Sequence, residues 1–174
     1  MKNLEKEQLE SLLDIIGYNS MPSLQVAHFS EGGYMLIDML KEYCIKKDYD
    51  YHLKCTNKDF YEASVERFKE QDGIVINNFF LQRRSYLIQA REYNFLFVTT
   101  VIDEEMRDDF LKKSHKIVRS AGSIIIFIGK KDYEERDNWC ALLEENLYVS
   151  TSVIDDMFDN YDVIISRKMH GWGD

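Results

Sequence analysis

The chain has 174 residues, enough for one domain with a single substantial core. Its net charge of −9 argues against duplex nucleic acid as a partner, because binding to phosphates requires clustered cations. No apolar signal core stands at the N-terminus and no apolar run reaches membrane-spanning length, so we expect a cytoplasmic protein outside the membrane. Cys44, Cys55 and Cys140 lack the spacing of zinc ligands, so we expect neither a metal nor a disulfide framework.

The predicted elements alternate between helices and strands along the chain. Residues 4–16 have leucines on one helical face, and we predict residues 1–22 as an N-terminal helical extension of a domain at 23–174. Within that domain, five strands are predicted, at residues 24–29, 49–55, 73–77, 94–100 and 123–129. A helix is predicted after each of them, in the same order at residues 33–46, 58–69, 81–93, 104–120 and 132–146.

The alternation ends after residue 146. Strands are predicted at 148–154 and 161–168, and only a short acidic loop joins them, which indicates a hairpin. Near-continuous apolar strands that alternate with helices indicate a parallel sheet covered on both faces. We therefore predict an α/β fold: a three-layer α/β/α sandwich around a seven-stranded, mostly parallel sheet with an antiparallel last strand.

This succession of seven strands resembles the Rossmann-like class I S-adenosylmethionine-dependent methyltransferases over residues 24–168. The segment "FLKKSHKIVRSAGSIIIFIG" is similar to the family's helix, glycine turn and fifth strand, and residues 119–122 (Arg-Ser-Ala-Gly) take the place of the turn. The resemblance implies the strand order 3-2-1-4-5-7-6. It also implies that S-adenosylmethionine, the family's cofactor, binds at the carboxyl ends of strands one, two and four.

The turn after the first strand, residues 28–33 (HFSEGG), is a diverged form of the family's D/E-x-G-x-G-x-G motif I. Depending on the alignment, Ala27 or His28 takes the place of the acid, and two of the three glycines are replaced. Glycines there let the backbone approach the ligand closely, whereas side chains crowd it. Gly32 and Gly33 therefore fit either a cofactor turn or a plain connection between strand and helix.

Polar residues at the ends of other strands complete the site that the resemblance implies. The family's acid after the second strand is replaced by Thr56 and Asn57, which can make weaker, neutral hydrogen bonds. Asn77 stands where the family places an acid or amide facing the adenine, with Phe79 or Phe80 available to pack on the base. We expect any ligand pocket to be rimmed by these cofactor-binding candidates: His28, Ser30, Glu31, Gly32, Gly33, Thr56, Asn57, Asn77 and Thr99.

Several of these residues also have simpler interpretations. His28 is the one candidate for a general base, although a lone histidine at a strand end is more often packed or hydrogen-bonded. Glu31 can contact a ligand or be an exposed carboxylate near a helix start. The Arg83-Arg84 pair is interpreted as part of a solvated face. The tail "SRKMHGWGD", which includes His170 and Trp172, can line an acceptor site or be a chain end docked on the surface.

Two functions are compatible with these observations. The first is S-adenosylmethionine-dependent methyl transfer to a small molecule or protein. DNA is disfavoured as the methyl acceptor, because the D/N-P-P-Y/F motif that DNA methyltransferases often have after strand four is missing. The second is a catalytically inactive methyltransferase-fold module that binds a protein partner or a nucleoside-like ligand. The sequence does not identify a methyl acceptor, and a homodimer remains open.

Overall fold

A computed structural model describes residues 6–16, 23–87 and 92–169 of the chain. Seven strands form one sheet in the order β3-β2-β1-β4-β5-β7-β6, in which β7 pairs antiparallel with β5 and β6 and the other pairs are parallel. The strands are β1 (Gln25–Ser30), β2 (Asp50–Cys55), β3 (Val75–Asn78), β4 (Tyr93–Val98), β5 (Val118–Gly129), β6 (Tyr148–Ile154) and β7 (Tyr161–Lys168). The predicted fold class, strand order and terminal hairpin are confirmed.

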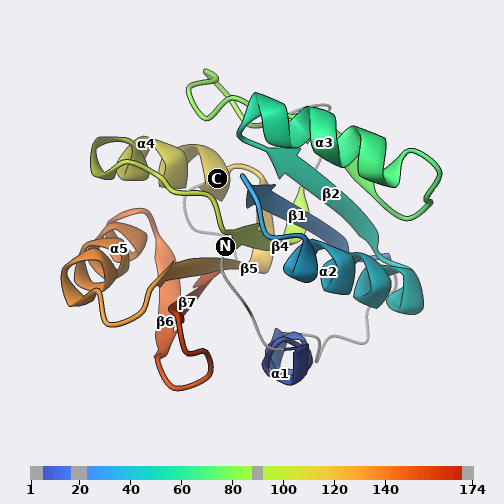
Figure 1. The fold of residues 1–174 in the computed structure, drawn as a ribbon. Coiled ribbons are helices and arrows are strands. Elements are labelled where there is room, and N and C mark those ends of the chain that lie inside the picture. The colour runs from blue at the N-terminus through green and yellow to red at the C-terminus, as the bar shows by residue number, and fades with distance from the viewer. Residues whose placement is uncertain (1–5, 17–22, 88–91, 170–174) are drawn as a thin grey trace.

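Helices cover both faces of the sheet (Figure 1). The helices are α1 (Lys6–Ile16), α2 (Tyr34–Lys47), α3 (Lys58–Phe68), α4 (Glu104–His115) and α5 (Tyr133–Glu145). Side chains of α1, α2 and α3 pack in one hydrophobic cluster, and those of α4 and α5 pack in a second one on the opposite face. The fully buried Trp139 of α5 belongs to the second cluster. None of the helices in the described ranges has the length and apolarity needed to cross a membrane.

Helix α1 packs on the same core as α2. Leu9, Leu12 and Leu13 are buried in one cluster with Leu36 and Leu40 of α2. Each buried leucine contributes roughly 1.5–3 kcal/mol relative to an exposed one, so the helix is held by burial of its apolar face. The division at residue 22 stays a prediction, since residues 17–22 lie outside the described part of the chain.

The helix predicted at residues 81–93 is wrong in the described part of that segment. Residues 81–87 form turns and irregular backbone, and Tyr93 already begins β4; residues 88–91 lie outside the described residues. Tyr86 explains the difference, because its ring is buried against Phe29 and Phe79 and its hydroxyl donates to the Leu81 carbonyl oxygen at 2.8 Å. Tertiary packing here outweighs the helical propensity of the segment.

The helix predicted at residues 104–120 runs five residues too far, because α4 stops at His115 and β5 begins at Val118. The predicted glycine turn at residues 119–122 is therefore a bulge inside β5, where the pairing with β4 shifts register and Ala121 has φ 64°. A Cβ on Gly122 would lie 2.9 Å from the Asn94 carbonyl oxygen, so glycine allows this close approach.

Candidate functional site

The carboxyl ends of β1, β2 and β4 bring five of the nine predicted cofactor-site residues together. His28, Ser30, Glu31, Thr56 and Thr99 lie within one hydrogen-bond network at this edge of the sheet. The parallel pairing of β1 with both β2 and β4 explains the juxtaposition, since the ends of neighbouring parallel strands meet at one edge. Gly32 and Gly33 follow directly in the turn to α2.

A chain of hydrogen bonds runs from the core to this turn. The Tyr51 hydroxyl lies 2.9 Å from Nδ1 of His28, and Nε2 of His28 lies 2.7 Å from Oγ1 of Thr99. Thr99 donates in turn to Oγ of Ser30 at 3.1 Å, and Ser30 donates to the Gly32 carbonyl oxygen at 2.7 Å. The single hydroxyl proton of Thr99 is directed to Ser30, so Thr99 accepts a hydrogen bond from Nε2 of His28. This arrangement assigns the Nε2–H tautomer to His28.

His28 is completely buried within this chain. Burial lowers the pKa of His28 to about 3, because a charged imidazole without access to water is unfavourable. A general base needs contact with the substrate and a pKa near the working pH. The burial of His28 and the engagement of both ring nitrogens therefore favour the packed, hydrogen-bonded interpretation over the catalytic one.

Glu31 connects the loops that follow β1 and β4. Its carboxylate accepts a hydrogen bond from Oγ1 of Thr100 at 3.2 Å and another from the backbone N–H of Val101 at 3.3 Å. Thr100 also lies 2.7 Å from Oγ1 of Thr56, so the loop after β2 joins the same network. Glu31 is exposed, and its place is in the turn, two residues before the left-handed Gly33 (φ 89°) that precedes α2.

Asn57 is bonded to the helix that follows it. Its side-chain oxygen accepts the backbone N–H of Phe60 at 3.0 Å, which makes it the N-cap of α3. N-cap side chains satisfy a backbone donor that has no partner within the helix. The Asn57 oxygen is thus engaged by its own helix.

We expect the Asn57→Ala variant to lose about 1 kcal/mol of unfolding free energy, because the N–H of Phe60 loses its acceptor. Urea unfolding followed by circular dichroism measures this change. Asn57→Asp is the matched control and should retain most of the stability, since aspartate also caps helices. Equal stability of the alanine variant and the unmodified protein would contradict the capping role.

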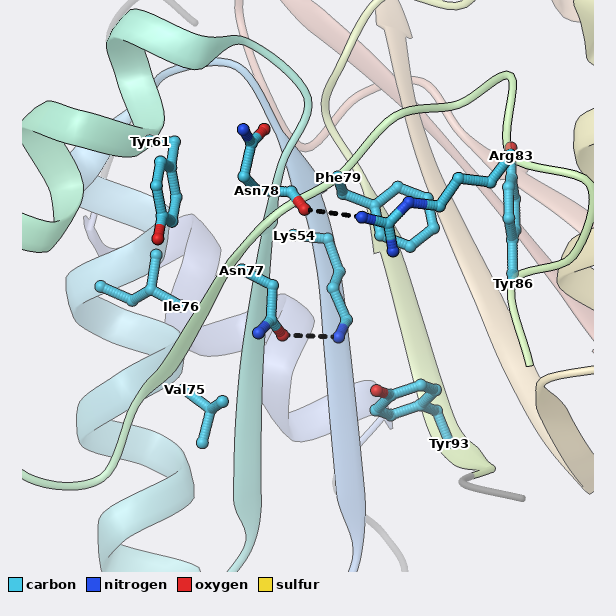
Figure 2. A pocket seen from close by; sticks show the side chains of 10 residues that line it. All are labelled: Lys54, Tyr61, Val75, Ile76, Asn77, Asn78, Phe79, Arg83, Tyr86 and Tyr93. Atoms are coloured by element: carbon cyan, nitrogen blue, oxygen red, sulfur yellow. Dashed lines mark hydrogen bonds between the residues drawn. The ribbon is translucent and has the colours of Figure 1, made fainter. Parts of the chain in front are cut away.

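Asn77 lies away from the network described above. It accepts a hydrogen bond from Nζ of Lys54 at 2.8 Å and lines a separate pocket of about 290 Å³ at the edge strand β3 (Figure 2). Phe79 is buried in an aromatic cluster with Phe29 and is not available to stack on a base, whereas Phe80 is exposed. The adenine contacts implied by the resemblance therefore do not assemble beside Ser30 and Glu31.

The cavities do not match the predicted rim as a whole. The cavity at the carboxyl edge has a volume of about 220 Å³ and lies toward β5; Glu31 and Thr99 are the predicted residues that line it. A larger one, about 460 Å³, lies between α1 and α2 and is lined by charged surface side chains such as Lys6 and Glu42. No group of three metal-ligating side chains comes together within the described ranges.

Lys54 and Arg83 were not among the predicted site residues, yet both line the pocket of Figure 2. The sequence could have indicated Lys54 as a site residue, because a lysine is rarely found within a strand that is otherwise buried. The expectation of a solvated Arg83-Arg84 pair holds for Arg84, which is exposed, but not for Arg83. His170 and Trp172 of the tail lie outside the described residues.

Comparisons with known proteins agree with the topology. No protein-family model and no curated protein sequence matches the chain. Among solved structures, the CurJ carbon methyltransferase superposes with a TM-score of 0.73 over 93% of this chain at 10% identity, and this chain spans about half (54%) of that chain. Because such a low identity carries information on the fold alone, nothing about activity follows from this match.

Two further structures are similar over most of this chain. The N-methyltransferase NodS from Bradyrhizobium japonicum WM9 gives a TM-score of 0.68 at 12% identity, with 95% of this chain and 99% of that chain covered. A SAM-dependent O-methyltransferase from Thermotoga maritima gives 0.69 at 8% identity, with 97% and 67% covered. The chain therefore has the Rossmann-like fold of the class I S-adenosylmethionine-dependent methyltransferases.

Proposed function

We propose that the chain is a methyltransferase-fold binding module that does not transfer methyl groups. One observation carries this proposal: the fully buried Ser30 hydroxyl donates to the Gly32 carbonyl oxygen and accepts the Gly32 N–H, so the turn after β1 bonds to itself. In the methyltransferases that the chain resembles, this turn is rich in glycine and its backbone faces the cofactor.

The residues at the carboxyl edge do not fit S-adenosylmethionine. The last residue of β2, Cys55, is buried, and Thr56 after it bonds to Thr100 and offers no carboxylate for ribose hydroxyls. Glu31 bridges to the loop after β4, across the place that the resemblance assigns to the ligand.

Methyl transfer to a small-molecule or protein acceptor is the second candidate. Two observations favour it: the chain covers nearly all of the N-methyltransferase NodS, and Gly33 keeps a left-handed conformation at the junction of β1 and α2. In that case S-adenosylmethionine would supply the activated methyl group. The chain's contribution would be to hold the acceptor in line with it.

Calorimetry with S-adenosylmethionine and S-adenosylhomocysteine separates the two candidates. We expect no heat of binding from the purified protein at ligand concentrations up to about 1 mM, because the edge is closed by its own side chains. The SAM-dependent O-methyltransferase from Thermotoga maritima serves as the positive control in the same buffer. A dissociation constant in the micromolar range would overturn the proposal in favour of methyl transfer.

A further inference from the structure

The pocket of about 290 Å³ at β3 is separate from the carboxyl-edge network. Its floor is formed where Lys54 of β2 pairs in register with Asn77 of β3. Tyr93, at the start of β4, lines its lower end in Figure 2, so the pocket extends along the sheet away from the ends of the strands. The pocket is bordered by the turns of residues 81–87, where a helix was expected.

The charge of the pocket is opposite to that of the chain. Lys54 and Arg83 are both among its lining residues, and no aspartate or glutamate is found among the described residues that line it. The chain as a whole has a net charge of −9, so the two cations of this pocket depart from its surroundings. Such a pocket attracts an anionic group, and its partial enclosure strengthens the attraction relative to bulk water.

Both cations are positioned by neighbouring groups. The guanidinium carbon of Arg83 lies 4.9 Å from the centre of the Phe79 ring, and Nη2 donates to the Asn78 carbonyl oxygen at 3.2 Å. Nζ of Lys54 donates to Asn77 and lies 5.9 Å from the centre of the Tyr93 ring. A stacked, pre-oriented guanidinium and an ammonium that line the same pocket suit the oxygens of a phosphate.

The opposite side of the pocket suits a planar, polar group. In Figure 2, Tyr61 and Ile76 lie on one side, the basic side chains lie on the other, and Asn77 and Asn78 stand between them. The side-chain amides can donate to and accept from the edge of a base, and the half-buried Tyr61 ring offers a stacking surface. Ile76 and Tyr61 pack in the cluster of α3, whereas Lys54 and Asn77 lie on the opposite face of the sheet, so the pocket wraps around the edge strand β3 and a bound ligand would cross this edge.

We propose that this pocket binds a nucleoside monophosphate, with the phosphate at Lys54 and Arg83 and the base toward Tyr61 and Asn78. The inference is independent of the proposed function, because none of the described residues belongs both to the lining of this pocket and to the carboxyl-edge network. It names a ligand with a phosphate, a group that S-adenosylmethionine does not carry.

The test is calorimetric titration of the full chain with AMP, GMP, CMP and UMP, and with inorganic phosphate and adenosine as partial ligands. At least one nucleotide is expected to bind at concentrations below about 1 mM, and more tightly than phosphate or adenosine. Arg83→Gln should weaken that binding about ten-fold or more, because it removes the phosphate fork. Arg84→Gln is the matched control, since the neighbouring Arg84 is exposed and outside the pocket, and should change the affinity less than about two-fold.

A second variant distinguishes ligand binding from structural support. Asn77→Asp keeps the size of the side chain and places a carboxylate 2.8 Å from Lys54. The fold should persist while this carboxylate offsets the charge of Lys54 and repels a phosphate, so the nucleotide should bind about ten-fold or more weakly. Thermal unfolding monitors the fold of each variant. Three results would overturn the proposal: no nucleotide binds, phosphate binds as tightly as the nucleotides, or the Arg84 variant loses as much affinity as the Arg83 variant.

Discussion

The Phe29→Ala variant is expected to lose about 3–5 kcal/mol of unfolding free energy, the cost of truncating a fully buried phenylalanine. The Phe29 ring lies within 6 Å of three other rings, at centroid distances of 4.9 Å from Phe79, 5.7 Å from Tyr86 and 5.6 Å from Phe110. Its removal leaves a cavity that joins β1, α4 and the segment after β3. Urea unfolding followed by circular dichroism measures the loss.

Phe80→Ala is the matched control, because this phenylalanine is 55% exposed one residue after the buried Phe79. We expect its effect to stay within about 0.5 kcal/mol, as for most surface substitutions. Similar losses for the two variants would contradict the assignment of Phe29 to the core. The unfolding free energy of a single domain is about 5–15 kcal/mol, so a measurable fraction of the Phe29→Ala variant should be unfolded at low urea concentrations.

The second large effect concerns pH. The pKa of His28 is lowered to about 3 in the folded protein, whereas an unfolded histidine titrates near its ordinary value of 6.5. Between these two values the unfolded chain binds a proton that the folded chain does not. The unfolding free energy therefore decreases as the pH falls below 6.5, by about 1.4 kcal/mol per pH unit from this residue.

The His28→Gln variant isolates this contribution, because glutamine can keep a hydrogen bond to Tyr51 or Thr99 but does not titrate. From pH 7 to pH 5, we expect the unmodified protein to lose about 2 kcal/mol more unfolding free energy than the variant. Urea unfolding at both pH values measures the difference. Equal losses in the two proteins would show that His28 is solvated or charged in the folded state.

The proposal of a binding module and the proposal of a nucleotide pocket depend on different residues. The first depends on Ser30 and Glu31 at the ends of β1 and β4, and the second on Lys54 and Arg83 beside β3. Titrations with S-adenosylmethionine and with nucleotides can therefore succeed or fail separately. A protein that binds AMP and not S-adenosylmethionine would use the methyltransferase fold to hold a ligand beside β3, and not at the carboxyl ends of β1, β2 and β4.

Local sequence patterns determined the sheet of this protein. The central strands contain short runs of apolar, often β-branched residues, such as residues 123–128 (SIIIFI), which are all buried in the structure. The hairpin of β6 and β7 followed from the missing helix between them. The order of the strands was not in the local pattern; it came from the resemblance, and the pairing of β1 with both β2 and β4 bears it out.

Only the tertiary structure decided the state of the site. The bonds of Thr99 to His28 and of Thr100 to Glu31 join residues about seventy positions apart, and no local pattern specifies such pairs. The segment after β3 was likewise decided by distant contacts, because Tyr86 gains more by packing against Phe29 than by continuing a helix. Sequence could thus place polar residues at one edge of the sheet, whereas packing determined that they bond to one another and that Lys54 and Arg83 line a pocket elsewhere.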